Sequence, residues 1–150
     1  MQTISLPDPI AQPEFYQGTA VKRFFSWMID LVIIFLISAV IATLPFFIGW
    51  FFFPLIFLAT QMIYCIGSLS RQSSTPGMRL MNIELRGPNG GYLQPGEAAL
   101  HTIAYVVSMG FVIPQLITLA LIMISPKGQG LHDLIVGATV INVPSKYSSA

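Results

Sequence analysis

Charge is scarce in this 150-residue sequence, and its scarcity excludes several classes of protein. Lys, Arg, Asp and Glu together make up 9% of the residues, whereas a soluble domain carries about 25%. The formal net charge of +1 favours neither a nucleic acid nor an acidic substrate as a partner. Hydrophobic residues make up 54%. Because such a chain would expose a large apolar surface in water, we expect it to lie in a lipid bilayer.

Cysteine and histidine are also rare. Cys65 is the single cysteine, so no disulfide can form within the chain. His101 and His132 lack cysteine partners and the short spacing of common metal sites, so we predict no metal site. The chain shows no nucleophile–base arrangement, and residues 75–77 lack the length and the lysine of a phosphate-binding loop. We therefore expect that the protein is not an enzyme.

Two long apolar runs are present. Residues 24–44 form a run of 21 mostly apolar residues, close to the roughly 20 needed to cross a bilayer. A second run covers residues 50–69, and we expect Pro54 to kink it near its start. The short connection between the runs carries no charge. The sequence therefore predicts two transmembrane helices.

Basic residues flank these runs on one side only. Lys22 and Arg23 precede the first run, and Arg71 and Arg79 follow the second. The positive-inside rule places both flanks in the cytoplasm. Residues 1–20 do not resemble a signal peptide, because no basic region precedes an apolar stretch there. We interpret them as a flexible cytoplasmic arm.

Two segments have the pattern of β-strands. Residues 81–86 alternate apolar and polar side chains, and a Gly-rich turn follows at residues 88–91. Residues 138–143 are rich in β-branched side chains. An unpaired strand cannot be satisfied in lipid, so we expect the two segments to pair as a small cytoplasmic sheet.

Residues 97–125 allow two interpretations. As one helix these 29 residues would be about 43 Å long and strongly tilted, whereas two passes of about 14 residues would each be too short. Pairing of the strands requires the segment to return to the cytoplasm. We predict a bent, shallow helical hairpin, and the alternative is a third span.

The predicted fold is an all-α membrane protein. It has two transmembrane helices and the bent helical hairpin or third span, with a small cytoplasmic β-sheet element. Residues 1–20 would form the arm, residues 21–143 the membrane domain, and residues 144–150 a C-terminal tail.

Three blocks of the sequence form a recognisable pattern: residues 22–30, which include Arg23 and Asp30, residues 74–85, and residues 130–140, which include Asp133. In this order the blocks resemble the RDD family of small bacterial membrane proteins, which is named for an arginine and two aspartates. The family's arginine and two aspartates correspond to Arg23, Asp30 and Asp133, with Ser26, Thr75, Pro76, Gly77, Arg79 and His132 as possible supporting residues.

The resemblance implies a multi-pass protein of the bacterial inner membrane, with the lipid bilayer as its surroundings and no cofactor. It implies transport of small ligands or exchange of cations and protons. Two or three spans are too few to enclose a path, so a carrier would have to form a homo-oligomer or join another membrane protein. The alternative is a non-catalytic membrane scaffold or assembly factor. Met78 occupies a position where family members commonly have lysine, so this chain gives no support to a function that requires a positively charged side chain there.

Asp30 lies seven residues after Arg23, and the two share one helix face with Ser26. A central aspartate costs roughly 2.5–3.5 kcal/mol on insertion, and each Leu, Ile, Val or Phe returns about 0.3–0.6 kcal/mol. Thirteen such residues make the span tolerable and leave Asp30 to face the helix bundle. It would either bind a proton or cation, or form a structural clasp with Arg23, Arg79 or a helix amide.

Asp133 and two polar stripes complete the candidate residues. Asp133 would cap a short element and pair with Arg23 or Arg79, or else coordinate an ion. The stripes would form hydrogen bonds between helices or line a hydrophilic path. Their members are Glu97, His101, Tyr105 and Ser108 in one stripe and Gln61, Tyr64 and Ser68 in the other.

Overall fold

A computed structural model describes residues 5–143, so the predicted tail at residues 144–150 lies outside the described residues. The chain is mostly helical and includes one two-stranded sheet, as the sequence predicts. In chain order the elements are η1 (Pro13–Phe15), α1 (Thr19–Thr43), η2 (Ile48–Phe52), α2 (Phe53–Gln72), α3 (Pro76–Leu80), β1 (Ile83–Arg86), α4 (Pro95–Met109), α5 (Val112–Ile124), α6 (Leu131–Val136) and β2 (Thr139–Asn142).

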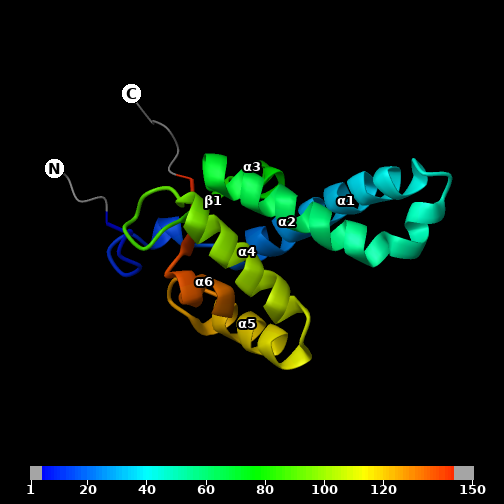
Figure 1. Ribbon diagram of the computed structural model, residues 1–150. Coiled ribbons are helices and arrows are strands. Elements are labelled where there is room, and N and C mark those ends of the chain that lie inside the picture. The colour runs from blue at the N-terminus through cyan, green and yellow to red at the C-terminus, as the bar shows by residue number, and fades with distance from the viewer. Residues whose placement is uncertain (1–4, 144–150) are drawn as a thin grey trace.

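Helices α1 and α2 form a long antiparallel hairpin (Figure 1). Both are long and apolar enough to cross a membrane, which confirms the two predicted spans. Pro45 follows the C-cap residue Leu44 of α1 and cannot continue the helix. Pro54 lies in the first turn of α2, where no intrahelical bond needs its missing N–H, so it begins this helix instead of kinking it.

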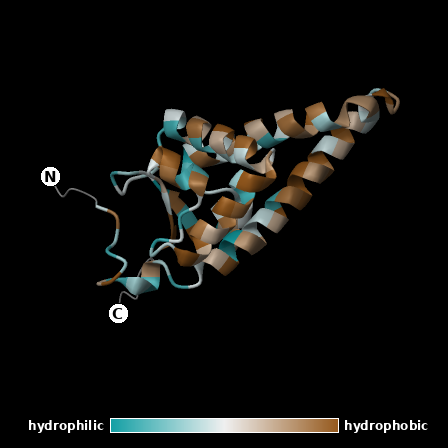
Figure 2. Ribbon diagram, turned by 90° about the horizontal axis from the view of Figure 1, so that it is seen from below, coloured by the Kyte–Doolittle hydropathy of each residue, from teal (hydrophilic) through white to brown (hydrophobic). Residues whose placement is uncertain are grey.

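The inner face of α1 is narrow because its side chains are small. Its buried residues recur mainly at four-residue intervals and include Ser38 and Ala42. A Cβ added to Gly49 of η2 would lie 2.5 Å from the carbonyl oxygen of Ala42, so the connection packs directly on the α1 backbone. The large side chains of α1 point outward, and Val40 is 61% exposed. In Figure 2, hydrophobic residues follow most of the hairpin.

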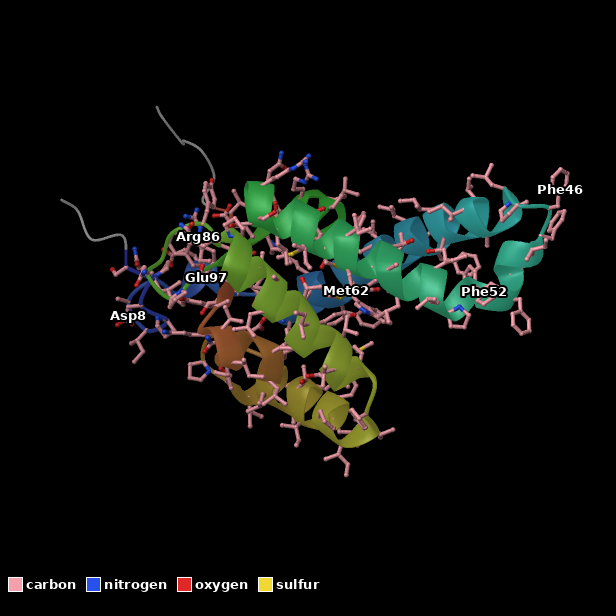
Figure 3. The ribbon with its side chains drawn as sticks, in the orientation of Figure 1. Asp8, Phe46, Phe52, Met62, Arg86 and Glu97 are labelled. Carbon is pink, nitrogen blue, oxygen red and sulfur yellow. The ribbon has the colours of Figure 1, made fainter. Side chains whose placement is uncertain are left out.

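The hairpin has one apolar end and one polar end. Phe46 and Phe52 lie at the tip of the hairpin, whereas Asp8, Arg86 and Glu97 lie at the opposite end of the molecule (Figure 3). This separation of charge from the apolar tip suits a chain that enters a bilayer from one side.

Helices α4 and α5 form the predicted bent hairpin. Their axes differ by 116° at a break that contains Gly110 and Phe111. The two helices have 15 and 13 residues, which correspond to roughly 20 Å each, less than the about 30 Å of a hydrocarbon core. Neither helix is therefore long enough to cross the core alone.

Strands β1 and β2 pair antiparallel, as expected for residues 81–86 and 138–143, with Leu85 opposite Val140. Tyr92, after the Gly-rich turn, makes only an isolated bridge to Arg86. The sheet packs on a small apolar core at the polar end of the molecule. That core consists of Leu69, Ile83, Leu85, Leu93, Ala98, Ala138 and Val140.

The described part of the expected N-terminal arm is docked on the sheet. The Asn142 side-chain amide donates to the carbonyl oxygens of Glu14 and Gln17 at 2.8 and 2.9 Å. The same side chain accepts from Lys22 Nζ at 2.6 Å. These contacts connect β2 to the start of α1.

Candidate functional site

Asp30 lies on the buried face of α1 and is 9% exposed. Its carboxylate accepts three hydrogen bonds from two other segments. Tyr64 of α2 donates its hydroxyl at 2.7 Å, and the Thr75 hydroxyl donates at 2.5 Å. The backbone N–H of Gly77 donates at 2.8 Å. One carboxylate thus connects α1, α2 and the first turn of α3.

The Thr75-Pro76-Gly77 segment is built for this contact. Thr75 is the N-cap of α3, and its hydroxyl oxygen also accepts from the Met78 N–H at 3.3 Å. A Cβ added to Gly77 would lie 2.8 Å from Asp30 Cγ and would also collide with the Ser26 carbonyl oxygen. Gly77 is therefore required for close approach and not, as a simple turn would suggest, for a positive φ.

The partners of Asp30 are all uncharged. Among residues 5–143, no basic side chain forms an ion pair with it. The helix amide expected in the structural interpretation is present, as Gly77, but Arg23 and Arg79 are not partners. Arg23 contacts another carboxylate, and Arg79 is exposed on α3.

That other carboxylate is Asp133, which is fully buried in α6. Arg23 Nη1 lies 2.6 Å from its Oδ2, and His101 Nε2 of α4 lies 2.7 Å from its Oδ1. The Gly130 N–H donates to Oδ2 at 2.9 Å, which caps α6. Burial acts to raise the pKa of Asp133, but Arg23 and the two histidines outweigh it and hold this pKa well below its ordinary value.

His132 lies beside this pair and is 6% exposed. Burial lowers the pKa of His132 to about 4, against the pull of Asp133, so its ring is neutral at physiological pH. Its Nε2 lies 3.4 Å from Arg23 Nη2. A guanidinium can only donate, so Nε2 accepts and the ring hydrogen resides on Nδ1. Within the described part of the chain, Nδ1 has no hydrogen-bond partner.

The comparison with protein families matches residues 18–137 to the RDD family, which covers most of the sequence and all three marked residues. The chain belongs to the RDD family. No curated protein and no solved structure matches it. In this RDD protein Arg23, which the resemblance assigns to the arginine of the family name, pairs with Asp133, and Asp30 has neutral partners.

The RDD protein brings together three groups that could in principle hold a metal ion. Ligand atoms of His101, His132 and Asp133 all lie within 4.8 Å of one another. Because His101 is 32 residues from Asp133, sequence spacing gave no signal for this cluster. The Arg23 guanidinium, however, lies 2.6 Å from the carboxylate and 3.4 Å from His132. It already supplies the positive charge that a metal would bring, so the residues do not fit a metal site.

A cavity of about 420 Å³ lies between the two carboxylates of this RDD protein. Asp30 and Asp133 both line it, and most of its wall is apolar. Tyr105 and Trp27 also contribute to the wall, and the Trp27 indole donates to the Tyr105 hydroxyl at 2.6 Å. The cavity therefore has the size of a small-ligand site, and Asp30 and Asp133 both lie in its wall.

Only some members of the predicted polar stripes have the two expected roles. His101, Tyr105 and Tyr64 make hydrogen bonds to other helices. Glu97 accepts from the Gln94 N–H at 2.8 Å and caps α4, and Ser108 donates to the Ala104 carbonyl of its own helix. Among them, His101, Tyr105 and Gln61 line the cavity.

Proposed function

We propose that this RDD protein is a small carrier of the bacterial inner membrane that exchanges a proton for a cation at Asp30. The observation that supports this most directly is the environment of the Asp30 carboxylate. It is buried in a helix long enough to span the membrane, it lines a cavity, and its partners are uncharged. An ionisable group within a membrane helix is by default a candidate for ion or proton binding.

The chemistry of the neighbours allows both bound species. A buried negative charge without a positive partner is costly, so a proton or a cation that neutralises it is stabilising. The hydroxyls of Tyr64 and Thr75 donate to the carboxylate at 2.7 and 2.5 Å. A hydroxyl can rotate and offer its oxygen lone pairs instead. The same two hydroxyl groups can therefore contact a charged carboxylate, a protonated one or a bound cation.

The proposed orientation places α3 and the sheet in the cytoplasm. Lys22, Arg23, Arg71 and Arg79 flank one end of the two spans, and the connection at the opposite end carries no charge. This distribution follows the positive-inside rule. Two full spans and a short bent pair are few for an enclosed path, so we propose that the carrier is a homo-oligomer or acts with another membrane protein. We propose no covalent catalysis.

A second candidate function is a non-catalytic membrane scaffold or assembly factor. It is favoured by the number of segments that the two carboxylates connect. Asp30 joins α1, α2 and α3, and Asp133 joins α1, α4 and α6. On this hypothesis both acids only hold the fold, and the sheet contacts a partner.

Exchange in vesicles tests the carrier. The purified protein is reconstituted into liposomes that contain a pH-sensitive dye, and Na⁺, K⁺ or Li⁺ is added outside. We expect Asp30→Asn to abolish cation-dependent pH change, because Asn keeps an acceptor oxygen but not the charge. Asp8→Asn is the matched control, since Asp8 lies outside the spans and only closes a local turn. It should leave exchange unchanged.

The two candidate functions predict different results for the same variants. If Asp30→Asn accumulates normally and loses exchange, the scaffold hypothesis fails. If it exchanges at the normal rate, the carboxylate has no part in transport. If it mainly lowers the amount of folded protein in the membrane, and the folded remainder exchanges normally, the scaffold hypothesis is favoured.

A further inference from the structure

Two buried polar atoms in the wall of the cavity have no partner. They are His132 Nδ1 and Thr118 Oγ1, and neither has a hydrogen-bond partner among residues 5–143. Both residues line the cavity, and they are 6% and 4% exposed. Buried polar groups are nearly always hydrogen-bonded, so an unpaired one requires an explanation. Two unpaired polar atoms in the wall of one cavity indicate a ligand that forms hydrogen bonds with them.

The two side chains approach one another at Gly130, although they belong to different helices. A Cβ added to Gly130 would lie 2.8 Å from Thr118 Cγ2 and 3.1 Å from His132 Cε1. The absence of a side chain at Gly130 therefore lets both side chains pack closely against its backbone. Thr118 and His132 thus lie next to one another in the wall of the same cavity.

The available hydrogens define the ligand atom. Because His132 Nε2 accepts from Arg23, its Nδ1 carries the ring hydrogen and can only donate. The Thr118 hydroxyl can donate as well. Two donors in the wall of one cavity fit an oxygen with two lone pairs and no hydrogen, and a carbonyl oxygen is the common group of this kind.

The rest of the cavity fits an apolar molecule that arrives from the bilayer. Phe24 and Leu31 of α1 line the cavity and are 55% and 37% exposed. On the bent pair, Met109 and Leu119 also line it and are 38% and 50% exposed. Partly exposed apolar side chains from α1 and from the bent pair thus form part of the cavity wall. The volume of about 420 Å³ lies within the roughly 300–1,000 Å³ of small-molecule sites.

We propose that this cavity binds an apolar, membrane-dissolved molecule through a carbonyl oxygen that accepts hydrogen bonds from Thr118 and His132. Two sources in a membrane have this chemistry, the ester-linked lipids and the quinones. The proposal does not rest on exchange at Asp30, because it depends on different atoms and a different ligand.

Fluorescence of Trp27 provides the test, because this side chain lines the cavity. Trp50 is the other tryptophan and lies in η2, beside the apolar tip. The Trp50→Phe protein is reconstituted into vesicles of ether-linked phosphatidylcholine, which has no ester carbonyl. Three quenchers are titrated: decyl-benzoquinone, dibrominated methyl stearate, and dibrominated octadecane, which matches the ester but lacks its carbonyl.

We expect saturable quenching by at least one carbonyl probe and only weak, non-saturating quenching by the bromoalkane. The probe that saturates identifies the source, an ester lipid or a quinone. Thr118→Val has nearly the same shape and removes the hydroxyl, so it should weaken the saturating probe about 3- to 10-fold and leave the bromoalkane unchanged. An unchanged thermal midpoint will show that this variant is folded.

Several results would overturn the proposal. In the first, the bromoester and the bromoalkane quench Trp27 equally, and quenching by the quinone does not saturate. This comparison requires no variant at position 118. In the second, a carbonyl probe quenches saturably, and its affinity is the same in the folded Thr118→Val variant. The first would mean that the cavity does not select carbonyls, and the second that this hydroxyl does not bind them.

Discussion

The two carboxylates of this RDD protein have opposite electrostatic surroundings. Asp133 and Arg23 form a pair whose charges cancel, and His101 and Gly130 satisfy the remaining acceptor positions. Among residues 5–143, Asp30 accepts hydrogen bonds only from neutral donors. Arg23 pairs with Asp133 and not with Asp30. Of the two acids, Asp133 is therefore the one that belongs to an ion pair.

Gly77 is predicted to be indispensable to the Asp30 cluster. In Gly77→Ala the new methyl group would collide with the Ser26 carbonyl oxygen and lie 2.8 Å from Asp30 Cγ. Either α3 moves away or its hydrogen bond to Asp30 breaks, and we expect a loss of about 1–3 kcal/mol of stability. Thermal unfolding in detergent measures it. Gly67→Ala in α2 is the matched control, because nothing lies within 4 Å of its added methyl group.

The control should be neutral or slightly stabilising, since alanine favours a helix over glycine by roughly 0.5–1 kcal/mol. Equal thermal midpoints for Gly77→Ala and Gly67→Ala would show that the close approach of α3 to α1 does not matter for stability.

At the scale of elements, the sequence was sufficient where length or pairing decided the outcome. Residues 97–125 were too long for one upright span and too short for two, which left the bent pair α4–α5. Residues 81–86 needed a partner strand, and residues 138–143 supplied it. The contacts of Arg23 were predicted in part. A pair between Asp133 and Arg23 was one of the expected alternatives and is present, whereas the clasp between Arg23 and Asp30 that their spacing on one helix suggested is not formed. Because Asp133 is 110 positions from Arg23, spacing along the chain could not decide between the two acids.

Helix α6 is predicted to loosen in mild acid because it buries a neutral histidine. The pKa of His132 is lowered by burial to about 4, whereas an unfolded histidine has a value of about 6.5. Between these values the unfolded chain binds the additional proton, so stability falls as the pH decreases from about 6.5 to about 4. The full shift corresponds to at most about 3 kcal/mol. His132→Gln cannot titrate there and should flatten this dependence.

Thermal midpoints measured at half-unit steps between pH 7 and 4 test this expectation. Asp133 does not contribute to the change in stability between pH 7 and 4, because its pKa is held far below this range. The stability that its ion pair contributes is lost only in stronger acid. A decline of equal size in His132→Gln would assign the acid sensitivity to another group.

At the scale of the whole molecule, the chain is organised as an apolar hairpin attached to a polar end. The small core beneath the sheet, the docked arm and the Arg23–Asp133 pair all belong to the polar end. The cavity lies where the bent pair meets α1, with Asp30 and Asp133 on its wall. Composition alone predicted the membrane setting, whereas the cavity could not be predicted. It arises from helix packing around Gly130 and from side chains on eight elements, which are α1, α2, α3, β1, α4, α5, α6 and β2.

A bent pair and a third span place the end of α5 on different sides of the membrane. If α4 and α5 enter the bilayer and return, Ser125 lies on the same side as Asp8, whereas a full crossing would place it on the opposite side. In a Cys65→Ser background, single cysteines at Asp8, Phe46 and Ser125 are treated with a membrane-impermeant maleimide applied to intact cells. In intact cells we expect labelling at position 46 alone, because the apolar tip reaches the far surface.

After permeabilisation, positions 8 and 125 should both react. Labelling of position 125 in intact cells, with position 8 still protected, would mean that residues 95–124 cross the bilayer and that the sheet cannot form from strands on one side.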